Sequence, residues 1–338
     1  MFSYVIAFCL TIVLIIFLKR PAIKLGLVDT PVGRKNHVGT PPLIGGLAIF
    51  IAFMLAALSS GQSLDQFYAL FAAMIILVLV GLLDDLHDLS TRSRFLTQIF
   101  AALLMTSWGG VVIENLGNLF GGGSVHLYGW AIPFTVFSVL GVINALNMID
   151  GIDGLAGGIS LTILSLLGAI AIFFGMVMHT SLIFILAAAV LGFLLFNMRS
   201  PWRKKASIFM GDAGSMMLGF ALVWFAVDLG RVVTPVTLVW IFAIPLMDTV
   251  RCMVRRILKR RSPFSADSEH LHHLFLRAGL SVSNTVLLIV IISILMGLIG
   301  LAGWYFKVPE NVMLGIFMLI FAGYYWTACH SSRLAGKP

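Results

Sequence analysis

Charged side chains are scarce in this chain. Asp, Glu, Lys and Arg make up only 11% of its 338 residues, while hydrophobic residues make up 60%. Soluble proteins carry roughly 25% charged residues, so a water-exposed surface is excluded for most of the molecule. The apolar excess fits a protein surrounded mainly by lipid, and no polar stretch is long enough to build a soluble domain. We therefore predict a single integral-membrane domain over residues 1–338.

Cysteine is also rare, and no cleavable signal peptide is visible. Cys9, Cys252 and Cys329 are far apart and lack metal-type spacing, so nothing suggests a disulfide framework or a thiolate metal site. The first apolar run has no basic region before it and is followed by Lys19-Arg20, without a small-residue cleavage site. We expect this run to be retained as the first span.

Long apolar runs dominate what is present. A helix needs about 20 mostly apolar residues to cross a bilayer core. The chain is therefore expected to be an all-α polytopic membrane protein with about eleven transmembrane helices. Their expected ranges are 2–18, 43–60, 65–83, 95–113, 130–147, 159–178, 181–197, 207–227, 235–254, 284–305 and 310–328. Between two of them, the glycine run in residues 111–130 separates alternating segments and predicts a short β-hairpin.

Basic residues mark one side of the membrane, because Lys and Arg concentrate in cytoplasmic loops. With the N-terminus outside, all 22 Lys and Arg residues except Arg231 and Lys307 fall in or beside the inside segments. These segments are 19–42, 84–94, 148–158, 198–206, 255–283 and the C-terminal tail. We expect a periplasmic N-terminus and a cytoplasmic C-terminus. The net charge of +8 is then explained by this topology, and it would attract anionic lipid head groups. No nucleic-acid partner is expected.

Carboxylates at the inner ends of apolar runs are the strongest functional signal. A carboxylate near hydrocarbon is costly and calls for a partner, water or a function. These residues are Asp84, Asp85, Asp150, Asp153 and Asp212. Their common side predicts one cation and phosphate site, although helix capping is an alternative for Asp212 and solvation of a helix end is one for Asp84-Asp85.

The segment Asn144-Ala-Leu-Asn-Met-Ile-Asp-Gly-Ile-Asp-Gly contains the most specific spacing. Asn147, Asp150 and Asp153 recur every three residues, so a helical turn would bring them toward one face. Amide and carboxylate oxygens suit a hard cation such as Mg²⁺. The neighbouring glycines allow close backbone approach, and glycine-mediated helix packing alone would leave the Asn and Asp residues unexplained.

Two basic loops and one isolated acid complete the candidates. His270, His272 and His273 follow a basic run, and Lys35 and His37 lie in a second basic, turn-rich loop. Cationic or hydrogen-bonding side chains of this kind suit a pyrophosphate, with inside-loop topology as the alternative. For Asp248 we expect a polar contact within the bundle, with a secondary site as the alternative.

Five dispersed motifs together resemble a known family. They are Asp29-Thr-Pro with Arg34-Lys-Asn-His37 and Gly45-Gly46, Leu83-Asp-Asp85, Asn144-Ala-Leu-Asn-Met-Ile-Asp-Gly-Ile-Asp-Gly-Leu-Ala, Phe196-Asn197 with Phe209-Met-Gly-Asp-Ala-Gly-Ser, and His270-Leu-His-His273. In this order they cover most of the chain and resemble the polyprenyl-phosphate N-acetylhexosamine-1-phosphate transferases. The resemblance implies a bacterial plasma-membrane enzyme with its active site on the cytoplasmic face.

That resemblance also implies a reaction and residue roles. GlcNAc-1-phosphate would pass from UDP-GlcNAc to undecaprenyl phosphate, giving undecaprenyl-pyrophosphoryl-GlcNAc and UMP, at the first membrane step of O-antigen, common-antigen or wall-polymer synthesis. Asn147, Asp150 and Asp212 match the family's Mg²⁺ region, with Mn²⁺ as a substitute. The other matched residues are Asp84, Asp85 and Asp153 for catalysis, and Lys35, His37, Asn197, Phe209, His270, His272 and His273 for substrate binding.

Several alternatives stay open at this stage. The His-Leu-His-His form favours GlcNAc over phospho-MurNAc-pentapeptide, and a 6-deoxy-N-acetylhexosamine is a further candidate sugar. Asp153 could also only hold its loop. Direct attack by the lipid phosphate and a covalent phospho-aspartate route would use the same residues. A homodimer is compatible with the sequence, which does not specify an oligomeric state. Outside the enzyme class, the rival is a cation-coupled transporter, which would place carboxylates near the bilayer midplane.

Overall fold

The computed structural model describes residues 2–29, 40–260, 262 and 269–335, and within these residues the regular structure is helical. The longer helices are α1 (Phe2–Lys24), α2 (Gly45–Leu58), α3 (Tyr68–His87), α4 (Thr91–Leu103), α5 (Ala131–Ile149), α6 (Leu155–Phe173), α7 (Val177–Asn197), α8 (Gly211–Leu229), α10 (Ala243–Leu258), α12 (Val282–Tyr305) and α13 (Glu310–Ala335). The shorter ones are η1 (Asp65–Phe67), η2 (Leu104–Trp108), η3 (Tyr128–Trp130), α9 (Pro235–Ile241) and α11 (Leu271–Arg277).

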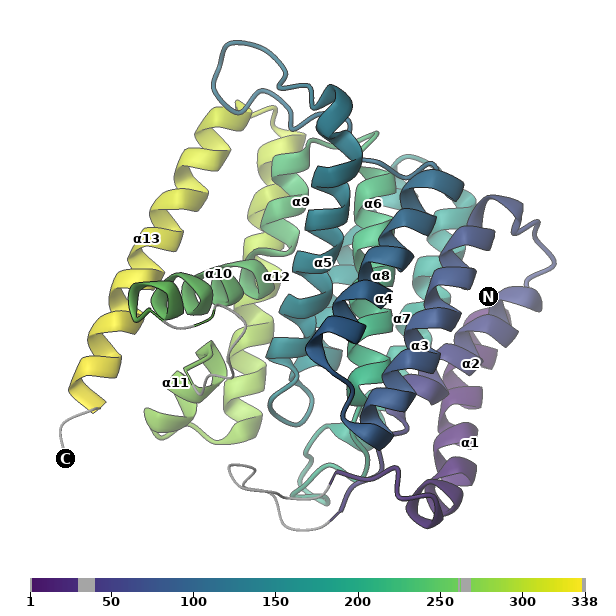
Figure 1. The fold of residues 1–338 in the computed structure, drawn as a ribbon. Helices are drawn as coiled ribbons and strands as arrows, with labels where there is room; N and C mark the ends of the chain where they lie inside the picture. Colours follow the sequence, from purple (N-terminus) through teal and green to yellow (C-terminus); the bar gives the residue numbers. More distant parts are fainter. Residues whose placement is uncertain (1, 30–39, 261, 263–268, 336–338) are drawn as a thin grey trace.

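Every expected span contains a helix, so the all-helical membrane fold is confirmed. Eight helices in the described part of the chain are long and apolar enough to cross a bilayer, or up to nine if a bent pair counts as one span. The helices alternate in direction along a common axis, and α13 stands apart from the main bundle (Figure 1). The shortfall from eleven arises because α2 and α4 are short and because α9 and α10 are not collinear.

The expected span over 235–254 is divided between two helices. The chain turns by 80° between α9 and α10, and α10 lies across the bundle (Figure 1). Pro245 explains the break, because a proline has no N–H to donate and its ring clashes with the carbonyl four residues earlier, that of Ile241. Ile241 is the last residue of α9, so the helix ends where that carbonyl would otherwise be obstructed. The bend brings α10 toward α11 and the polar end of α5.

The expected hairpin at 111–130 is reduced to a hydrogen-bonded turn. One isolated antiparallel bridge joins Asn115 to His126, and neither flank forms a strand. Backbone hydrogen bonds from Leu116 to Val125 and from Val125 to Gly117 continue the pairing for a single step. The glycine run then interrupts it, because Gly121 and Gly123 adopt positive φ.

Close helix approaches hold α8 at the centre of the bundle, where nearly all of its side chains are buried. A Cβ added at Gly46 of α2 would lie 2.2 Å from Gly214, and one added at Gly81 of α3 would lie 2.3 Å from Ala213. Small residues at these contacts allow the helix backbones to touch, as is common in membrane bundles. The contacts fix the beginning of α8, where Asp212 lies.

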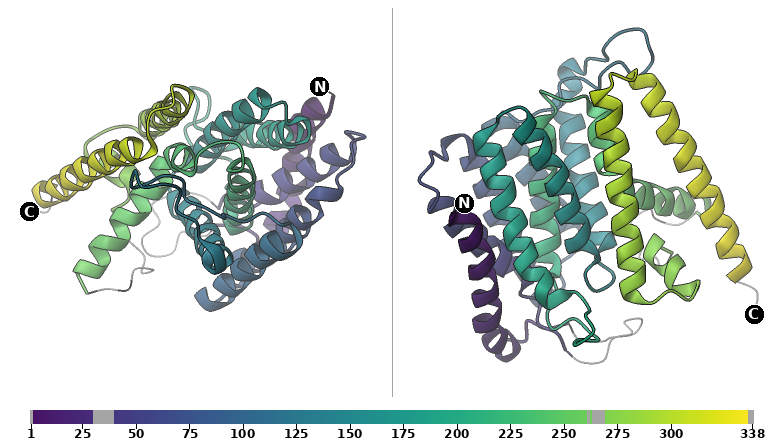
Figure 2. Two further views of the ribbon diagram at one scale, coloured as in Figure 1. Left: turned by 90° about the horizontal axis from the view of Figure 1, so that it is seen from above. Right: turned by 180° about the vertical axis from the view of Figure 1, so that it is seen from behind.

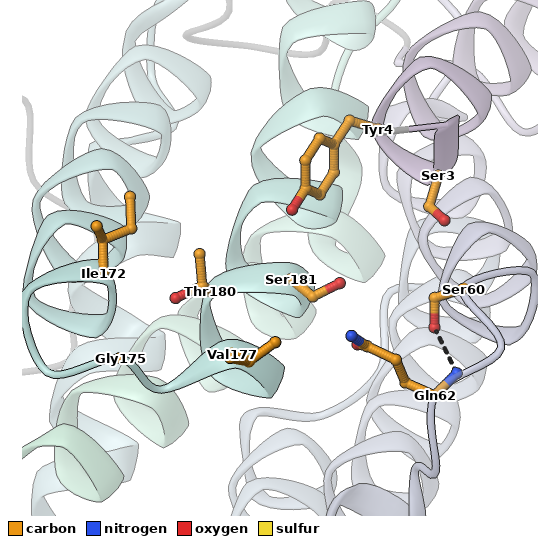
Figure 3. A pocket seen from close by; sticks show the side chains of 9 residues that line it. All are labelled: Ser3, Tyr4, Ser60, Gln62, Ile172, Gly175, Val177, Thr180 and Ser181. Atoms are coloured by element: carbon orange, nitrogen blue, oxygen red, sulfur yellow. Dashed lines mark hydrogen bonds between the residues drawn. The ribbon is translucent and has the colours of Figure 1, made fainter.

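The two ends of the bundle differ in chemistry. At the end that holds the start of α1, a cavity of about 370 Å³ lies beside the turns that follow α2 and α6 (Figure 3). None of its lining residues is charged; they are Ser3, Tyr4, Ser60, Gln62, Ile172, Gly175, Val177, Thr180 and Ser181. The α3–α4, α5–α6 and α7–α8 turns, which follow or contain the candidate carboxylates, lie at the other end (Figure 2).

Candidate active site

A polar pocket of about 370 Å³ lies at this second end, and is called the active-site pocket below. It lies among α4, α5, α8, α10 and the histidine segment 270–273. Its lining residues are Thr91, Arg94, Phe95, Gln98, Asn144, Asn147, Met148, Gly151, Met216, Arg256, His270, His272 and His273. Residues far apart in the sequence, from α4 to α11, are therefore brought to one cavity. Cationic and hydrogen-bonding side chains predominate among its polar groups, as a polyanionic ligand requires.

Asp212 links this pocket to the carboxylate cluster. Its Oδ1 accepts a hydrogen bond from Asn147 Nδ2 at 2.5 Å, and its Oδ2 lies 3.6 Å from Arg94 Nη1. The same Asn147 amide also donates to Ser215 Oγ at 2.8 Å. The expected association of Asn147 with Asp212 is therefore present across α5 and α8.

The adjacent carboxylates Asp84 and Asp85 point to different partners. Asp84 is buried, faces Arg94 Nη1 at 3.1 Å and accepts the backbone N–H of Leu89 at 2.8 Å. Asp85 accepts hydrogen bonds from the backbone N–H of Asp212 at 2.9 Å and from that of Ala213 at 3.3 Å. These bonds satisfy N–H groups in the first turn of α8, which have no partner within the helix. Neither carboxylate lines the active-site pocket, and Arg94 is the link between Asp84 and that pocket. Their expected roles in handling the lipid phosphate stay predictions.

The loop after α5 separates Asp150 from Asp153. Burial and then the charges of Asp212 and Asp153 raise the pKa of Asp150 to about 7. Asp153 Oδ2 instead accepts Arg199 Nε at 2.7 Å and the backbone N–H of Ala206 at 3.1 Å. Asp153 thus ties the α5–α6 loop to the α7–α8 loop, while Asp150 adds negative charge near Asp212.

The oxygen donors around Asp212 fit a hard divalent cation. Asp150, Asp212 and Asn147 offer carboxylate and amide oxygens, which Mg²⁺ prefers over nitrogen and sulfur. Burial is the main cause of the raised pKa of Asp150, and the charges of Asp212 and Asp153 add to it; a bound cation would offset that repulsion. The chemistry of these donors suits the metal expected from the sequence, and the magnesium site stays a prediction.

The histidine segment forms the opposite wall of the active-site pocket. The ring of His272 stacks on that of His270 at a centroid distance of 5.9 Å and lies 4.2 Å from that of His273. A Cβ added at Gly151 would lie 2.5 Å from His272 Nε2, so this glycine leaves room for the imidazole beside the α5–α6 loop. All three predicted histidines are therefore brought together with Asn147.

Two further predicted binding residues, Asn197 and Phe209, are not at this wall. Asn197 is buried, with Oδ1 accepting the N–H of Gly154 at 2.8 Å and Nδ2 donating to the Ile208 carbonyl at 3.0 Å. The Phe209 backbone pairs with Pro42 and Gly45, joining the α7–α8 loop to the start of α2. Lys35 and His37 lie outside the described residues. Asn197 holds the loops that shape the site, and a nucleoside contact by Asn197 or Phe209 stays a prediction.

Sequence reasoning missed three side chains of the pocket. Arg94 joins Asp84 and Asp212, while Arg256 is buried and lines the pocket from α10. Gln98 accepts a hydrogen bond from Asn144 Nδ2 at 2.7 Å across α4 and α5. A signal was available for Arg94, because it lies in the short polar segment that follows the acidic pair, directly before the next apolar run. Nothing in the basic run distinguished Arg256 from its neighbours.

An apolar groove of about 1070 Å³ adjoins the pocket. The two cavities share Phe95, Asn144 and Met148. From there the groove runs along α5, α9 and α10 toward residues 110–116 at the other end of the bundle. Most of its lining surface is apolar, with side chains such as Phe134, Phe137, Leu238 and Phe242. The combined cavity can accept a ligand with a charged head and a long apolar tail.

Comparison with known proteins agrees with these observations. Residues 67–230 match the family described as Glycosyl transferase family 4. The chain is 35% identical to the undecaprenyl-phosphate alpha-N-acetylglucosaminyl 1-phosphate transferase of Yersinia pestis, over 94% of this chain and 88% of that protein. Proteins of the same name from Haemophilus influenzae and Escherichia coli (strain K12) are 36% and 37% identical, over 99% and 93% of this chain and 95% and 87% of theirs.

These similarities extend along nearly the whole length of each relative, and they confirm the resemblance that the five motifs indicated. They also favour a transferase over a transporter. The chain belongs to glycosyl transferase family 4.

Proposed function

We propose that this protein transfers GlcNAc-1-phosphate from UDP-GlcNAc to undecaprenyl phosphate, releasing UMP and forming undecaprenyl-pyrophosphoryl-GlcNAc. The junction of the active-site pocket with the apolar groove at Phe95, Asn144 and Met148 is the observation that carries this proposal. A polyprenyl phosphate has the matching chemistry, because its phosphate needs polar partners and its tail needs apolar surface. The relatives are N-acetylglucosaminyl 1-phosphate transferases, which supports GlcNAc as the sugar.

The reaction joins two anions, so charge must be neutralised as they approach. An oxygen of the lipid phosphate attacks the β-phosphorus of UDP-GlcNAc, and the bond from that phosphorus to the bridging oxygen of UMP breaks. Arg94 at one side of the pocket and Arg256 with the histidine segment at another can bind the phosphate oxygens. Cationic side chains on different sides of the pocket would let the lipid phosphate approach the pyrophosphate of UDP-GlcNAc.

The carboxylate cluster has a second task in this proposal. Asn147, Asp150 and Asp212 would hold Mg²⁺, or Mn²⁺ as a substitute, which when bound supplies positive charge to the pyrophosphate as a Lewis acid. Arg94 contacts both Asp84 and Asp212 and so holds these carboxylates beside the pocket. Asp84 and Asp85 position the lipid phosphate from behind Arg94, and the covalent phospho-aspartate route is the competing mechanism.

The proposed location follows from charge and geometry together. The pocket lies at the end of the bundle that carries most of the Lys and Arg residues, which supports a cytoplasmic site in a bacterial plasma membrane. The lipid would enter sideways through the groove, and the nucleotide would arrive from water. A cation-coupled transporter would instead need its carboxylates near the bilayer midplane.

A substrate panel tests the proposal. Purified protein in detergent is mixed with undecaprenyl phosphate, Mg²⁺ and one of several UDP-sugars, and UMP is measured. We expect UMP from UDP-GlcNAc only when the lipid acceptor is present. Greater activity with UDP-MurNAc-pentapeptide or a 6-deoxy sugar would contradict the assignment of the sugar, and no UMP from any donor would contradict the enzyme. Exchange of labelled UMP into UDP-GlcNAc without lipid would contradict direct attack.

A further inference from the structure

Asp248 of α10 lies outside the active-site pocket, yet it contacts the segment that forms one wall of it. The side chain is only 1% exposed. Its Oδ2 lies 2.8 Å from His270 Nδ1, and its Oδ1 accepts the backbone N–H of Leu271 at 2.9 Å. Tyr324 of α13 donates to the same Oδ1 at 2.8 Å, and Arg251 donates to it at 3.2 Å. One buried carboxylate therefore joins α10, α13 and the histidine segment.

This geometry defines how His270 is oriented. An ionised carboxylate can only accept hydrogen bonds, so Nδ1 of His270 carries a proton in this contact. The ring's other nitrogen, Nε2, is then left for the pocket that His270 lines. Arg251 and Arg255 also bind Glu269, at its carbonyl and carboxylate respectively, so the backbone before His270 is fixed to α10 as well.

We propose that Asp248 is a positioning residue for phosphate transfer, which holds His270 in its cationic form with Nε2–H directed at the pyrophosphate of the sugar nucleotide. This inference rests on the proposed function. It assigns a role to an acid that sequence reasoning left as a bundle contact. It also distinguishes a charged imidazole, His270, from a neutral one, His272.

The electrostatics support that division. Burial alone would lower the pKa of His270, but the hydrogen bond and the charge of Asp248 outweigh burial and raise it to about 9. Burial and the neighbouring imidazoles lower the pKa of His272 to about 3. The titratable and charged groups around His270 are Asp248, Arg251 and Cys252 of α10, Tyr324 of α13 and His272 of α11.

A metal ion is the competing occupant of this cluster. Ligand atoms of Asp248, Cys252 and His270 lie within 4.8 Å of one another. However, Arg251 Nη2 lies 3.2 Å from Asp248 Oδ1 and 3.5 Å from Cys252 Sγ. A cation placed there would meet the buried guanidinium at contact distance, so the positive charge is already supplied by Arg251.

The kinetic test compares Asp248→Asn with Asp228→Asn. The control fits because Asp228 also pairs with a histidine, His179, at 2.7 Å, but does so at the other end of the bundle. We expect Asp248→Asn to lower kcat/KM for UDP-GlcNAc roughly 10- to 100-fold at pH 8. In wild type, kcat/KM should fall at high pH with a limit near pH 9. In Asp248→Asn this limit should lie lower by more than about one pH unit, because burial favours neutral imidazole once the carboxylate charge is removed. Asp228→Asn should keep the wild-type profile.

A double-mutant cycle with His270→Gln separates positioning from mere loss of structure. If Asp248 acts through His270, the double variant should be hardly worse than His270→Gln alone. His270→Gln should itself lack the alkaline limit near pH 9, which keeps the idea testable if Asp248→Asn does not fold. The proposal would be overturned if His270→Gln kept the alkaline limit near pH 9. It would also be overturned if the activity losses of the two single variants were fully additive and Asp248→Asn kept the wild-type pH profile.

Thermal unfolding gives a readout that does not depend on the reaction. A histidine whose pKa is raised on folding stabilises the protein fully below about pH 6.5, and the effect disappears as pH rises to about 9. The melting temperature of wild type should fall over that interval, and that of Asp248→Asn should fall less. Equal slopes of melting temperature against pH in the two proteins would refute the charged Asp248–His270 pair. If the slopes differ but wild type releases no UMP, the proposed function is wrong and the charged pair is supported.

Discussion

Asp150 and Asp153 lie in one short loop but have different surroundings. Asp153 is satisfied by Arg199 and by the backbone N–H of Ala206, so its charge is used to join two loops. The pKa of Asp150 is instead raised, first by burial and then by the repulsion of Asp212 and Asp153. A carboxylate under repulsion is suited to bind a cation, whereas one with an ion-pair partner is suited to hold structure.

Substitution of the two acids by asparagine should therefore separate activity from stability. We expect Asp150→Asn to lower kcat for Mg²⁺-dependent UMP release by about 10²- to 10³-fold, because it removes a charge from the proposed metal site, with little change in melting temperature. Asp153→Asn should lower the free energy of unfolding by about 1.5–3 kcal/mol, because a charge-assisted hydrogen bond is lost. The measurements are UMP release and thermal unfolding of both variants in one detergent. Full activity in Asp150→Asn would remove it from the metal site.

At the scale of elements, α8 carries the site because glycines let it approach its neighbours. The contacts of Gly46 with Gly214 and of Gly81 with Ala213 lie within one turn of Asp212. Asp85 caps the same turn by accepting the first N–H groups of the helix. A shift of α2 or α3 by a fraction of an ångström would thus displace Asp212 from Asn147.

We expect Gly81→Ala to disturb both stability and activity. Its Cβ would lie 2.3 Å from the Ala213 Cα, which is backbone and cannot rotate away, so α3 and α8 must separate. Overpacking of this kind costs about 1–3 kcal/mol. The melting temperature and UMP release should fall together.

The matched control is Gly315→Ala, in α13, where an added Cβ meets nothing within 4 Å. This variant should keep the wild-type melting temperature and activity, because alanine is a better helix former than glycine. A Gly81→Ala protein that behaves like Gly315→Ala would show that the α3–α8 distance is not critical for the site.

At the scale of the whole molecule, sequence pattern predicted the helices better than their arrangement. Apolar run length located a helix in every expected span, since burial in lipid demands continuous hydrophobicity. Run length could not show that Pro245 divides 235–254 into two helices at 80°, because hydropathy does not report direction. The apolar groove beside α10 was invisible for the same reason.

The candidate site was predictable to the extent that its residues lie in local motifs. Asn147, Asp212 and the three histidines meet as expected, because each lies at the same end of a span. Arg94 and Arg256 were missed since their roles arise from contacts between α4, α8 and α10. Asp85 and Asn197 do not line the active-site pocket, and their contacts are with backbone groups, which side-chain chemistry alone does not reveal.

Orientation in the membrane is the property on which the location of the reaction depends. The two ends of the bundle offer single exposed positions for a labelling test: Trp202 is 94% exposed in the α7–α8 loop, and a Cβ at Gly122 meets nothing within 4 Å. The α7–α8 loop, which contains Trp202, lies at the end that holds the active-site pocket, and the loop before α5, which contains Gly122, lies at the opposite end (Figure 1). We expect Trp202 to lie in the cytoplasm and Gly122 to lie outside the cell membrane, because basic residues concentrate in cytoplasmic loops.

Cysteine placed at either position should report this orientation. In a background with Cys9 and Cys329 changed to serine, an impermeant maleimide added to intact cells expressing the protein should label Gly122→Cys and leave Trp202→Cys unlabelled. After permeabilisation both should react, while the parent, whose Cys252 is buried, should react at neither stage. Labelling of Trp202→Cys alone in intact cells would invert the topology. It would place the pocket on the periplasmic side, away from the nucleotide that the proposed reaction consumes.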